Sequence, residues 1–325
     1  DRAEQELKRQ YLSRSLYGVE VVTTVTPIER NRVNVTFNIS EGSAAKIKEL
    51  RILGNTAFSE SSLKDLLELN DGGWLTWYTK ANRYSRAKLN ADLETLRAYY
   101  LNRGYLEFNV ESTQVSISPD KDGVEITIDV NEGELYRVSG IRFGGELLGR
   151  QNEFEPLVQL KPGDVFSGSK LTDSTKRISE KLGTLGYAFA NVNAVPQIDR
   201  EKREVAFDIL VDPGRRVYVR RIDIAGNMRT RDEVIRRELR QYEDAWYDAE
   251  KIRLSRSRVD RLGYFTEVKI DTRPVPDAPD QVDLGVTVTE RPTGNISLGI
   301  GFSSTEKVIL SGSIVQPNFL GTGKS

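Results

Sequence analysis

The chain of 325 residues contains no cysteine and no histidine, and each absence removes whole classes of chemistry. Without cysteine there is no thiol nucleophile and no cysteine-rich zinc site. Without histidine there is no imidazole ligand for haem and no histidine base for a catalytic triad. No constellation of carboxylate, tyrosine or lysine side chains stands out in their place. We therefore expect no enzyme, no catalytic residue, no cofactor and no metal site.

The sequence also lacks a long apolar run and a net charge. No stretch approaches 18 consecutive apolar residues, so we expect no membrane-spanning helix, and nothing at the start resembles a signal peptide. Lys plus Arg (47) nearly cancel Asp plus Glu (48), so no overall field favours nucleic acid or anionic lipid. The first ten residues read like the inside of a polar helix, which suggests a fragment.

The sequence does contain an internal repeat with a period of about 80 to 90 residues. One marker is a strand of alternating apolar residues that runs into an acidic turn. Its four copies are residues 33–42, 124–133, 205–214 and 282–291. A second marker is a glycine-tyrosine pair that closes a helix, where glycine supplies the left-handed cap. Its copies are Gly104-Tyr105, Gly186-Tyr187 and Gly263-Tyr264.

A third marker opens each complete unit: a short apolar strand followed by a glycine turn at Gly54-Asn55, Gly144-Gly145 or Gly226-Asn227. A short helix follows, and Thr230 with Glu233 has the capping-box spacing that would start it in the last copy. Each unit thus reads strand, helix, helix, strand, strand. That order predicts an α+β fold, with a three-stranded mixed sheet and two helices on one face. Residues 119–122 are rich in turn formers and predict a hairpin turn.

The pattern changes after residue 292, where helical signals vanish. Ile296, Leu298, Ile300 and Phe302 alternate with glycine and serine, and a second alternating run at 308–316 follows a polar turn. Segments of about ten residues with one apolar face are typical of transmembrane β-strands. A soluble antiparallel hairpin is the alternative. Two strands cannot close a barrel, so we expect the protein to continue past residue 325.

The repeated unit resembles the POTRA (polypeptide-transport-associated) domain, and an array of such units before glycine-spaced strands is similar to the BamA family of outer-membrane β-barrel assembly factors. The most specific stretches are residues 92–100, 236–241 and 318–323. The resemblance implies that residues 1–43 are the C-terminal part of a second POTRA domain. It implies further POTRA domains, and then barrel strands, in the following order: the third at 44–134, the fourth at 135–214, the barrel-proximal fifth at 215–291, and the first strands of an outer-membrane β-barrel at 292–325.

The resemblance also implies a function: a non-enzymatic scaffold in the outer membrane of a Gram-negative bacterium, with its POTRA arm in the periplasm. It would bind unfolded β-barrel proteins and promote their insertion into the membrane. Implied partners are these clients, accessory lipoproteins that include a helical-repeat lipoprotein at the fifth POTRA domain, periplasmic chaperones and outer-membrane lipid around the barrel. No nucleic acid is expected.

Two stretches are candidates for client binding. An extended client can add itself to an unpaired sheet edge through main-chain hydrogen bonds that are independent of its sequence. In the first complete unit the candidate edge residues are Val110, Ser112, Gln114 and Ser116, although such an edge can also be merely solvated. The resemblance further implies pairing of client strands with the first barrel strand, whose candidate residues are Ile296, Leu298, Ile300 and Phe302.

The charged run after the first helix of the last unit is a third candidate. By resemblance, Glu243 matches the acidic position that docks the helical-repeat lipoprotein, and Arg240 would be its neighbour. A solvated charged face is the alternative. The aromatic residues 74–78 are explained either by a loop that fills its own small core or by a protein contact. Residues 321–325 end like a phosphate-binding loop, but Asn318 replaces the first glycine and no strand-to-helix context surrounds them.

Two other functions remain open from the sequence. A translocation pore of the two-partner secretion type also joins POTRA units to a barrel, but the three complete copies and part of a fourth favour assembly. A soluble periplasmic interaction protein built from POTRA-like modules would have no barrel.

Overall fold

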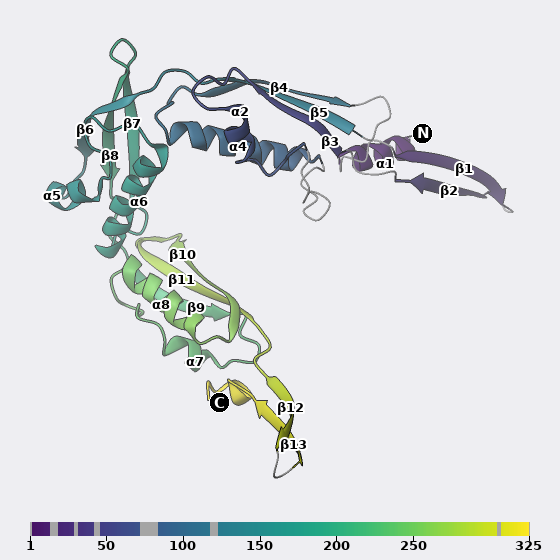
Figure 1. Ribbon diagram of the computed structural model, residues 1–325. Coiled ribbons are helices and arrows are strands. Elements are labelled where there is room, and N and C mark those ends of the chain that lie inside the picture. Colours follow the sequence, from purple (N-terminus) through teal and green to yellow (C-terminus); the bar gives the residue numbers. More distant parts are fainter. Residues whose placement is uncertain are drawn as a thin grey trace. The chain divides into compact units, whose positions relative to one another are not determined.

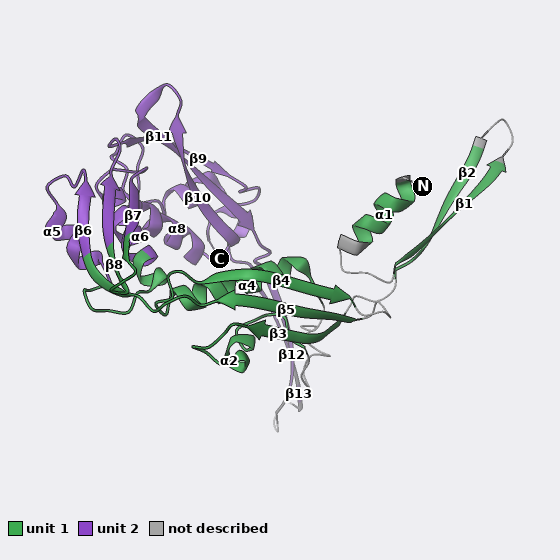
Figure 2. Cartoon of the chain, turned by 90° about the horizontal axis from the view of Figure 1, so that it is seen from above, with its two compact units in different colours: residues 1–140, 160–171, 197–206 green, residues 141–159, 172–196, 207–325 purple. Residues whose placement is uncertain are grey.

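The computed structural model describes residues 2–13, 19–28, 32–41, 46–71, 84–117, 123–303 and 307–324. The chain divides into two compact units (Figure 2), one made of residues 1–140, 160–171 and 197–206, and the other of residues 141–159, 172–196 and 207–325. The dividing line runs through the second of three complete repeats. The predicted turn at 119–122 and the aromatic residues 74–78 lie outside the described residues.

The chain begins with helix α1 (Arg2–Ser13) and an antiparallel pair of strands, β1 (Glu20–Ile28) and β2 (Arg32–Ser40). Helix and strand are joined by Glu4, which accepts a hydrogen bond from the Thr23 hydroxyl at 2.9 Å. The order helix, strand, strand is that of the second half of each later repeat.

The first complete repeat has the predicted order of elements. Its central strand β5 pairs in parallel with β3 and antiparallel with β4, so β4 and β3 are the sheet edges. Figure 1 shows α4 running along one face of this sheet. The elements are β3 (Lys46–Leu53), α2 (Glu60–Lys64), α4 (Arg86–Leu101), β4 (Asn109–Ile117) and β5 (Gly123–Asn131).

The core of this repeat lies between the sheet and its helices, because alternating residues of β5 and every third or fourth residue of α4 are apolar. Each such buried side chain stabilises the fold by roughly 1.5–3 kcal/mol. The buried set is Ile47, Leu50, Ile52, Leu63, Leu67, Leu69, Tyr84, Leu89, Leu96, Tyr100, Phe108, Val124, Ile126, Ile128 and Val130.

The middle repeat has strands in the order β6-β8-β7, with β7 at the edge. Its core contains Phe154, Ile178, Leu182, Ile209 and Val211. The elements are β6 (Arg137–Gly145), α5 (Gln151–Phe154), η1 (Glu155–Leu157), α6 (Gly168–Thr184), β7 (Asn191–Asp199) and β8 (Glu204–Asp212).

The last repeat again has a parallel pair, β9 with β11, and an antiparallel edge strand, β10. Its core combines Val219, Ile235, Val259, Leu284 and Val286 from all of its layers. The elements are β9 (Tyr218–Ala225), α7 (Asp232–Arg236), α8 (Ala249–Arg261), β10 (Phe265–Val275) and β11 (Ala278–Glu290). The predicted fold class is confirmed for all three complete repeats.

At the end of the first strand of each repeat, the backbone conformation and a close neighbour require glycine. Gly226 has φ +86, and a Cβ there would collide with the carbonyl oxygen of Val288 on the adjacent strand. Gly54 and Gly145 stand in the same relation to Val130 and Val211. Only glycine combines this left-handed backbone with so close an approach. The predicted left-handed glycine of the second marker is also found, at Gly104, Gly186 and Gly263.

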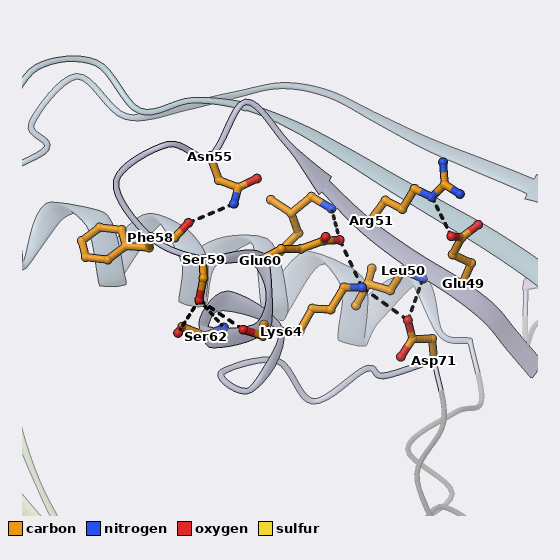
Figure 3. Close-up of polar contacts among 12 residues, drawn as sticks. Glu49, Leu50, Arg51, Asn55, Phe58, Ser59, Glu60, Ser62, Lys64 and Asp71 are labelled. Carbon is orange, nitrogen blue, oxygen red and sulfur yellow. Dashed lines mark hydrogen bonds and ion pairs between the residues drawn. The ribbon is translucent and has the colours of Figure 1, made fainter.

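The predicted capping box of the last repeat is wrong. Helix α7 begins after Arg231, which is the N-cap residue and makes no side-chain cap bond. The Thr230 side chain is buried and its hydroxyl accepts a hydrogen bond from the Asn318 amide instead. In the first complete repeat, Ser59 caps α2 by accepting from the Ser62 N–H (Figure 3).

After the last repeat, strands β12 (Asn295–Ser303) and β13 (Lys307–Val315) form an antiparallel pair. The short turn η2 (Phe319–Gly321) follows and lies beside α7 (Figure 1). Among the described residues, no helix has the length and apolar character needed to cross a membrane.

Candidate functional site

The candidate edge strand of the first complete repeat is an edge in the structure, since β4 pairs with β5 on one side only. A β-bulge at Glu111 shifts the register between Val110 and Ser112. The bulge divides the predicted set: Val110 lies opposite buried Val130 and packs against the core, whereas the other three lie on the outer face. These three are Ser112, Gln114 and Ser116, opposite Asp129, Thr127 and Glu125.

The opposite edge of the same sheet is covered by side chains. The backbone N–H of Ile52 in β3 donates to the Glu60 carboxylate at 3.1 Å, and that of Leu50 donates to the Asp71 carboxylate at 3.4 Å (Figure 3). Carboxylates therefore occupy donors that an added strand would need. Within the described residues, no side chain is hydrogen-bonded to the backbone of β4.

The equivalent edges of the other repeats contain proline. Pro196 lies within β7 and Pro274 lies within β10, next to a register shift. Because proline has no N–H, it interrupts the row of donors that an incoming strand uses. Strand β4 contains no proline between Asn109 and Ile117. Of the three edge strands β4, β7 and β10, β4 is therefore the one best able to accept an extended chain.

The candidate partner residue Glu243 lies in the loop after α7, and 44% of its side chain is exposed. Its carboxylate accepts a hydrogen bond from the Ile222 N–H of β9 at 2.7 Å and lies 3.5 Å from the Arg236 guanidinium. The structure therefore places Glu243 beside Arg236. The Arg240 guanidinium instead donates to the Leu239 carbonyl oxygen at 3.2 Å.

The first complete repeat has the same arrangement at the equivalent positions. Asp71 accepts from the Leu50 N–H and lies 3.4 Å from the Lys64 ammonium group. An acid at this position thus closes the edge of the first strand in both repeats. Within the repeat, Glu243 therefore has a structural role. A contact with a partner would use the part of its side chain that stays exposed.

Two exposed aromatic side chains lie close to Glu243 in the sequence, and the sequence pattern by itself assigns a role to neither of them. Tyr242 is 62% exposed and Trp246 is 51% exposed. The Arg216 guanidinium lies 4.2 Å from the Trp246 ring centroid, and the Tyr218 ring makes an edge contact with Trp246. Exposed, preorganised aromatic rings are typical of interface anchors. The sequence feature that points to them is the presence of two aromatic residues in the acidic loop 241–246.

The candidate strand β12 presents an apolar face. Ile296, Leu298 and Ile300 are each at least 70% exposed. Their cross-strand neighbours Ile314 and Leu310 in β13 are equally exposed and lie on the same face. Phe302 lies in β12 opposite Val308, and its side chain is outside the described set. An exposed apolar face of this kind needs a nonpolar environment or a partner.

Two acidic side chains with lowered pKa values close the turns that open the first and the last complete repeat. Glu132 is buried and accepts hydrogen bonds from the Thr56 hydroxyl (2.5 Å), the Ala57 N–H (2.9 Å) and the Tyr100 hydroxyl (2.7 Å). Burial raises its pKa, but the hydrogen bonds from Thr56 and Tyr100 outweigh this and the net pKa is lowered. Burial, and then the bond to Glu132, raises the pKa of Tyr100.

Glu290 closes the same turn in the last repeat by accepting from the N–H groups of Arg229 (3.0 Å) and Thr230 (2.7 Å). Burial raises its pKa, but the hydrogen bonds from the Thr230 backbone, the Thr230 side chain and the Arg229 backbone together outweigh this, so its net pKa is also lowered. These perturbed acids are explained by turn closure. Within the described ranges, no cluster of three acidic side chains could hold a metal ion.

Comparison with known proteins places these repeats in a family. The profile described as "POTRA: Surface antigen variable number repeat" matches residues 45–133, 136–214 and 217–291. The Outer membrane protein assembly factor BamA of Neisseria meningitidis serogroup B is 37% identical over 320 residues, which cover 98% of this chain and 40% of that protein. BamA of Buchnera aphidicola is 32% identical over 91% of this chain and 48% of that protein. The chain thus spans less than half the length of these relatives.

Solved structures agree. The structure of Haemophilus influenzae BamA POTRA3-5 is 36% identical with a TM-score of 0.68, covering 76% of this chain and 96% of that one. BamA from Haemophilus ducreyi lacking POTRA domains 1-3 is 36% identical with a TM-score of 0.51, covering 58% of this chain and 36% of that one. By profile, sequence and structure, this chain belongs to the BamA family of outer membrane protein assembly factors and carries its POTRA repeats.

Proposed function

We propose that this chain is the client-receiving part of an outer-membrane protein assembly factor, and that β4 takes up unfolded β-barrel proteins by strand addition. The open edge of β4 carries this proposal. It has three polar outer-face side chains, Ser112, Gln114 and Ser116, and no proline, while the β3 edge of the same sheet is closed by Glu60 and Asp71. Backbone pairing suits a receptor for many clients, because it does not depend on their side chains.

The same proposal assigns each repeat its place in the series of POTRA domains. Residues 1–43 are the end of the second POTRA domain, and the next three domains occupy 44–134, 135–214 and 215–291. Residues 292–325 begin the membrane barrel, which the exposed apolar face of β12 and β13 supports. The first barrel strand, Ile296 to Phe302, is a second place where a client strand can pair, because an open strand edge is costly in lipid.

The fifth domain binds a helical-repeat lipoprotein of the assembly complex. Glu243 and Arg240 lie in this surface, and the exposed rings of Tyr242 and Trp246 give it the aromatic anchors that such contacts use. Periplasmic chaperones that deliver clients are further partners. The arm lies in the periplasm of a Gram-negative bacterium and the barrel lies in its outer membrane. The process uses no catalytic residue, cofactor or nucleic acid, and the free energy comes from client folding.

The β4 edge is tested by photo-crosslinking in cells. A crosslinking amino acid is placed at Gln114 on β4 and, as a matched control, at Asn193 on the proline-containing edge strand β7. We expect client adducts at Gln114 and few at Asn193. A proline at Thr113 should weaken the Gln114 adducts, because the Thr113 N–H points away from β5 and proline removes this donor. Equal yields at the two sites, or adducts that survive the proline, would rule out strand addition at β4.

A further inference from the structure

The turn between β9 and α7 holds a distant segment of the chain, residues 318–323, which we call the clasp. The Asn318 amide donates to the Thr230 hydroxyl at 2.8 Å, and the Arg231 N–H donates to the Gly321 carbonyl oxygen at 3.0 Å. The hydroxyl of Tyr264, which lies between α8 and β10, donates to the Gly323 carbonyl oxygen at 3.4 Å. The clasp therefore contacts the last repeat at three points along its length.

The clasp is fitted closely to the turn. Asn318 and Gly321 are buried, and a Cβ on Gly321 would collide with the carbonyl oxygen of Arg229. Asn318 adopts the left-handed conformation (φ +61), and its side-chain oxygen accepts from the Gly323 N–H at 2.8 Å. Asparagine tolerates this conformation better than most residues.

Apolar side chains contribute little to this contact. Phe319 and Leu320 are 57% and 75% exposed, although they lie between the buried Asn318 and Gly321. The clasp is thus recognised through its backbone and one amide side chain. Such a contact depends on geometry, and a small change of backbone shape at Gly321 is enough to break it.

The other end of the strand pair is tied to the same turn. Glu290, the last residue of β11, accepts from the N–H groups of Arg229 and Thr230, and β12 begins five residues later. The Thr293 hydroxyl in this connection donates to the Pro317 carbonyl oxygen at 2.9 Å. The chain that enters β12 and the chain that leaves β13 are therefore joined to each other and to one turn of the last repeat.

We propose that this turn is a docking site for the clasp, and that it fixes the orientation of the β12–β13 pair relative to the last repeat. One covalent connection alone would allow the pair to swivel. Two attachments at one turn make the last repeat and the first strand pair a single mechanical body, so that a movement of the repeat is transmitted to β12. This inference rests on contacts within the last repeat and residues 290–324, and it is independent of client binding.

The docking is tested by hydrogen exchange on the intact protein in detergent micelles. Gly321→Ala expels the clasp, and Gly149→Ala is the matched control, because Gly149 has nearly the same φ (+69 against +73) but open space where its Cβ would lie. We expect Gly321→Ala to accelerate exchange of the Arg231 N–H by about 5- to 30-fold, the factor for a lost hydrogen bond of one to two kcal/mol. Gly149→Ala should leave this rate unchanged.

A gentler pair of variants covers the case in which Gly321→Ala misfolds. Thr230→Val removes the hydroxyl that receives Asn318 and also bonds Glu290, and Thr266→Val removes a hydroxyl of the same repeat that donates to the Thr289 carbonyl oxygen. Docking is supported if the Arg231 N–H exchanges faster in Thr230→Val and at an unchanged rate in Thr266→Val. Unchanged exchange in both Gly321→Ala and Thr230→Val would overturn it.

The orientation claim has its own measurement, because the chain has no native cysteine to interfere with labelling. Spin labels at Lys269→Cys on β10 and Ser313→Cys on β13 report the distance between the last repeat and the strand pair. We expect a narrow distance distribution that broadens with Gly321→Ala and stays narrow with Gly149→Ala. A distribution that is equally narrow or equally broad in all three proteins would show that the clasp does not set the orientation.

Discussion

The first complete repeat and the last repeat have the same skeleton but cover the turn after their first strand in different ways. In both, a glycine-asparagine turn is closed by a carboxylate, buried Glu132 or half-buried Glu290, and by the asparagine amide. In the first, the residue after the turn is Phe58, which packs edge-on against Tyr99, Tyr100 and Tyr105. In the last, the equivalent residue is Thr230, and its hydroxyl receives the clasp.

This difference separates what holds a repeat together from what the repeat does. The glycine, the asparagine and the carboxylate recur because the turn needs them. Phe58 packs into an aromatic cluster of its own repeat, whereas the Thr230 hydroxyl is a hydrogen-bond acceptor for the clasp. The outer edges differ too, since β4 contains no proline and β10 contains Pro274. We infer that the first complete repeat is built to receive a strand and the last is built to hold its neighbours.

The largest expected effect tests the shared skeleton. Gly54→Ala and Gly226→Ala should each cost more than about 2 kcal/mol of unfolding free energy, because the added Cβ combines left-handed strain with a backbone collision. Gly149→Ala, with similar φ and open space, should cost only about 1 kcal/mol. Urea unfolding of the three variants measures this. A cost at Gly54 or Gly226 no larger than that at Gly149 would contradict the common turn.

The next effect distinguishes the two carboxylates. Glu132→Ala should cost about 3 kcal/mol, because it leaves the buried Tyr100 hydroxyl and two turn donors without their acceptor. Glu290→Ala should cost about 1 to 2 kcal/mol, because its partners are two backbone N–H groups nearer the surface. Urea unfolding again measures both. The reverse order would show that the first repeat does not depend on its aromatic core in the way described.

A pH dependence follows from the same two acids. Their pKa values in the folded protein are below the ordinary 4.5, so the stability they contribute is present above pH 4.5 and is lost as the pH falls through the lowered values. We expect the melting temperature to fall on acidification below pH 4.5. The double variant Glu132→Gln, Glu290→Gln should show a shallower fall. An identical pH profile would mean that other carboxylates dominate.

The smallest effect on stability tests the partner surface. Asp71→Ala and Glu243→Ala remove the same edge-closing acid from two repeats, and each should cost less than about 1 kcal/mol, because both acids are partly exposed. Only Glu243→Ala should weaken capture of the helical-repeat lipoprotein, by about tenfold. Co-purification with and without each substitution measures this. Equal loss with Asp71→Ala would point to a general structural effect.

The sequence predicts the repeat well because its signals are local. Alternating apolar residues define β5, β8 and β11, and the recurring glycines mark turns whose backbone only glycine adopts. The same locality explains the errors. The Thr230 hydroxyl has the right spacing for a cap, but it is bound to Asn318, which is 88 residues away in the chain. No local pattern reports such a contact.

The candidate site was predicted less completely for similar reasons. The bulge at Glu111 inserts one residue, so that Val110 and Ser112 lie on opposite faces although strict alternation would place them together. Glu243 was found through family resemblance. Its structural counterpart Asp71 was not recognised, because the shared feature is a hydrogen bond to the backbone of the first strand and the residue types differ.

The central claim is that clients add as a strand to β4, and amide protection measures this most directly. An unfolded β-barrel segment is added to the isotope-labelled protein, and exchange of the β4 and β7 N–H groups is followed by nuclear magnetic resonance. The account predicts new protection at the alternate residues of β4 whose N–H groups point away from β5, Thr113 and Val115, and none along β7. Protection of both edges alike, or of neither, would contradict it.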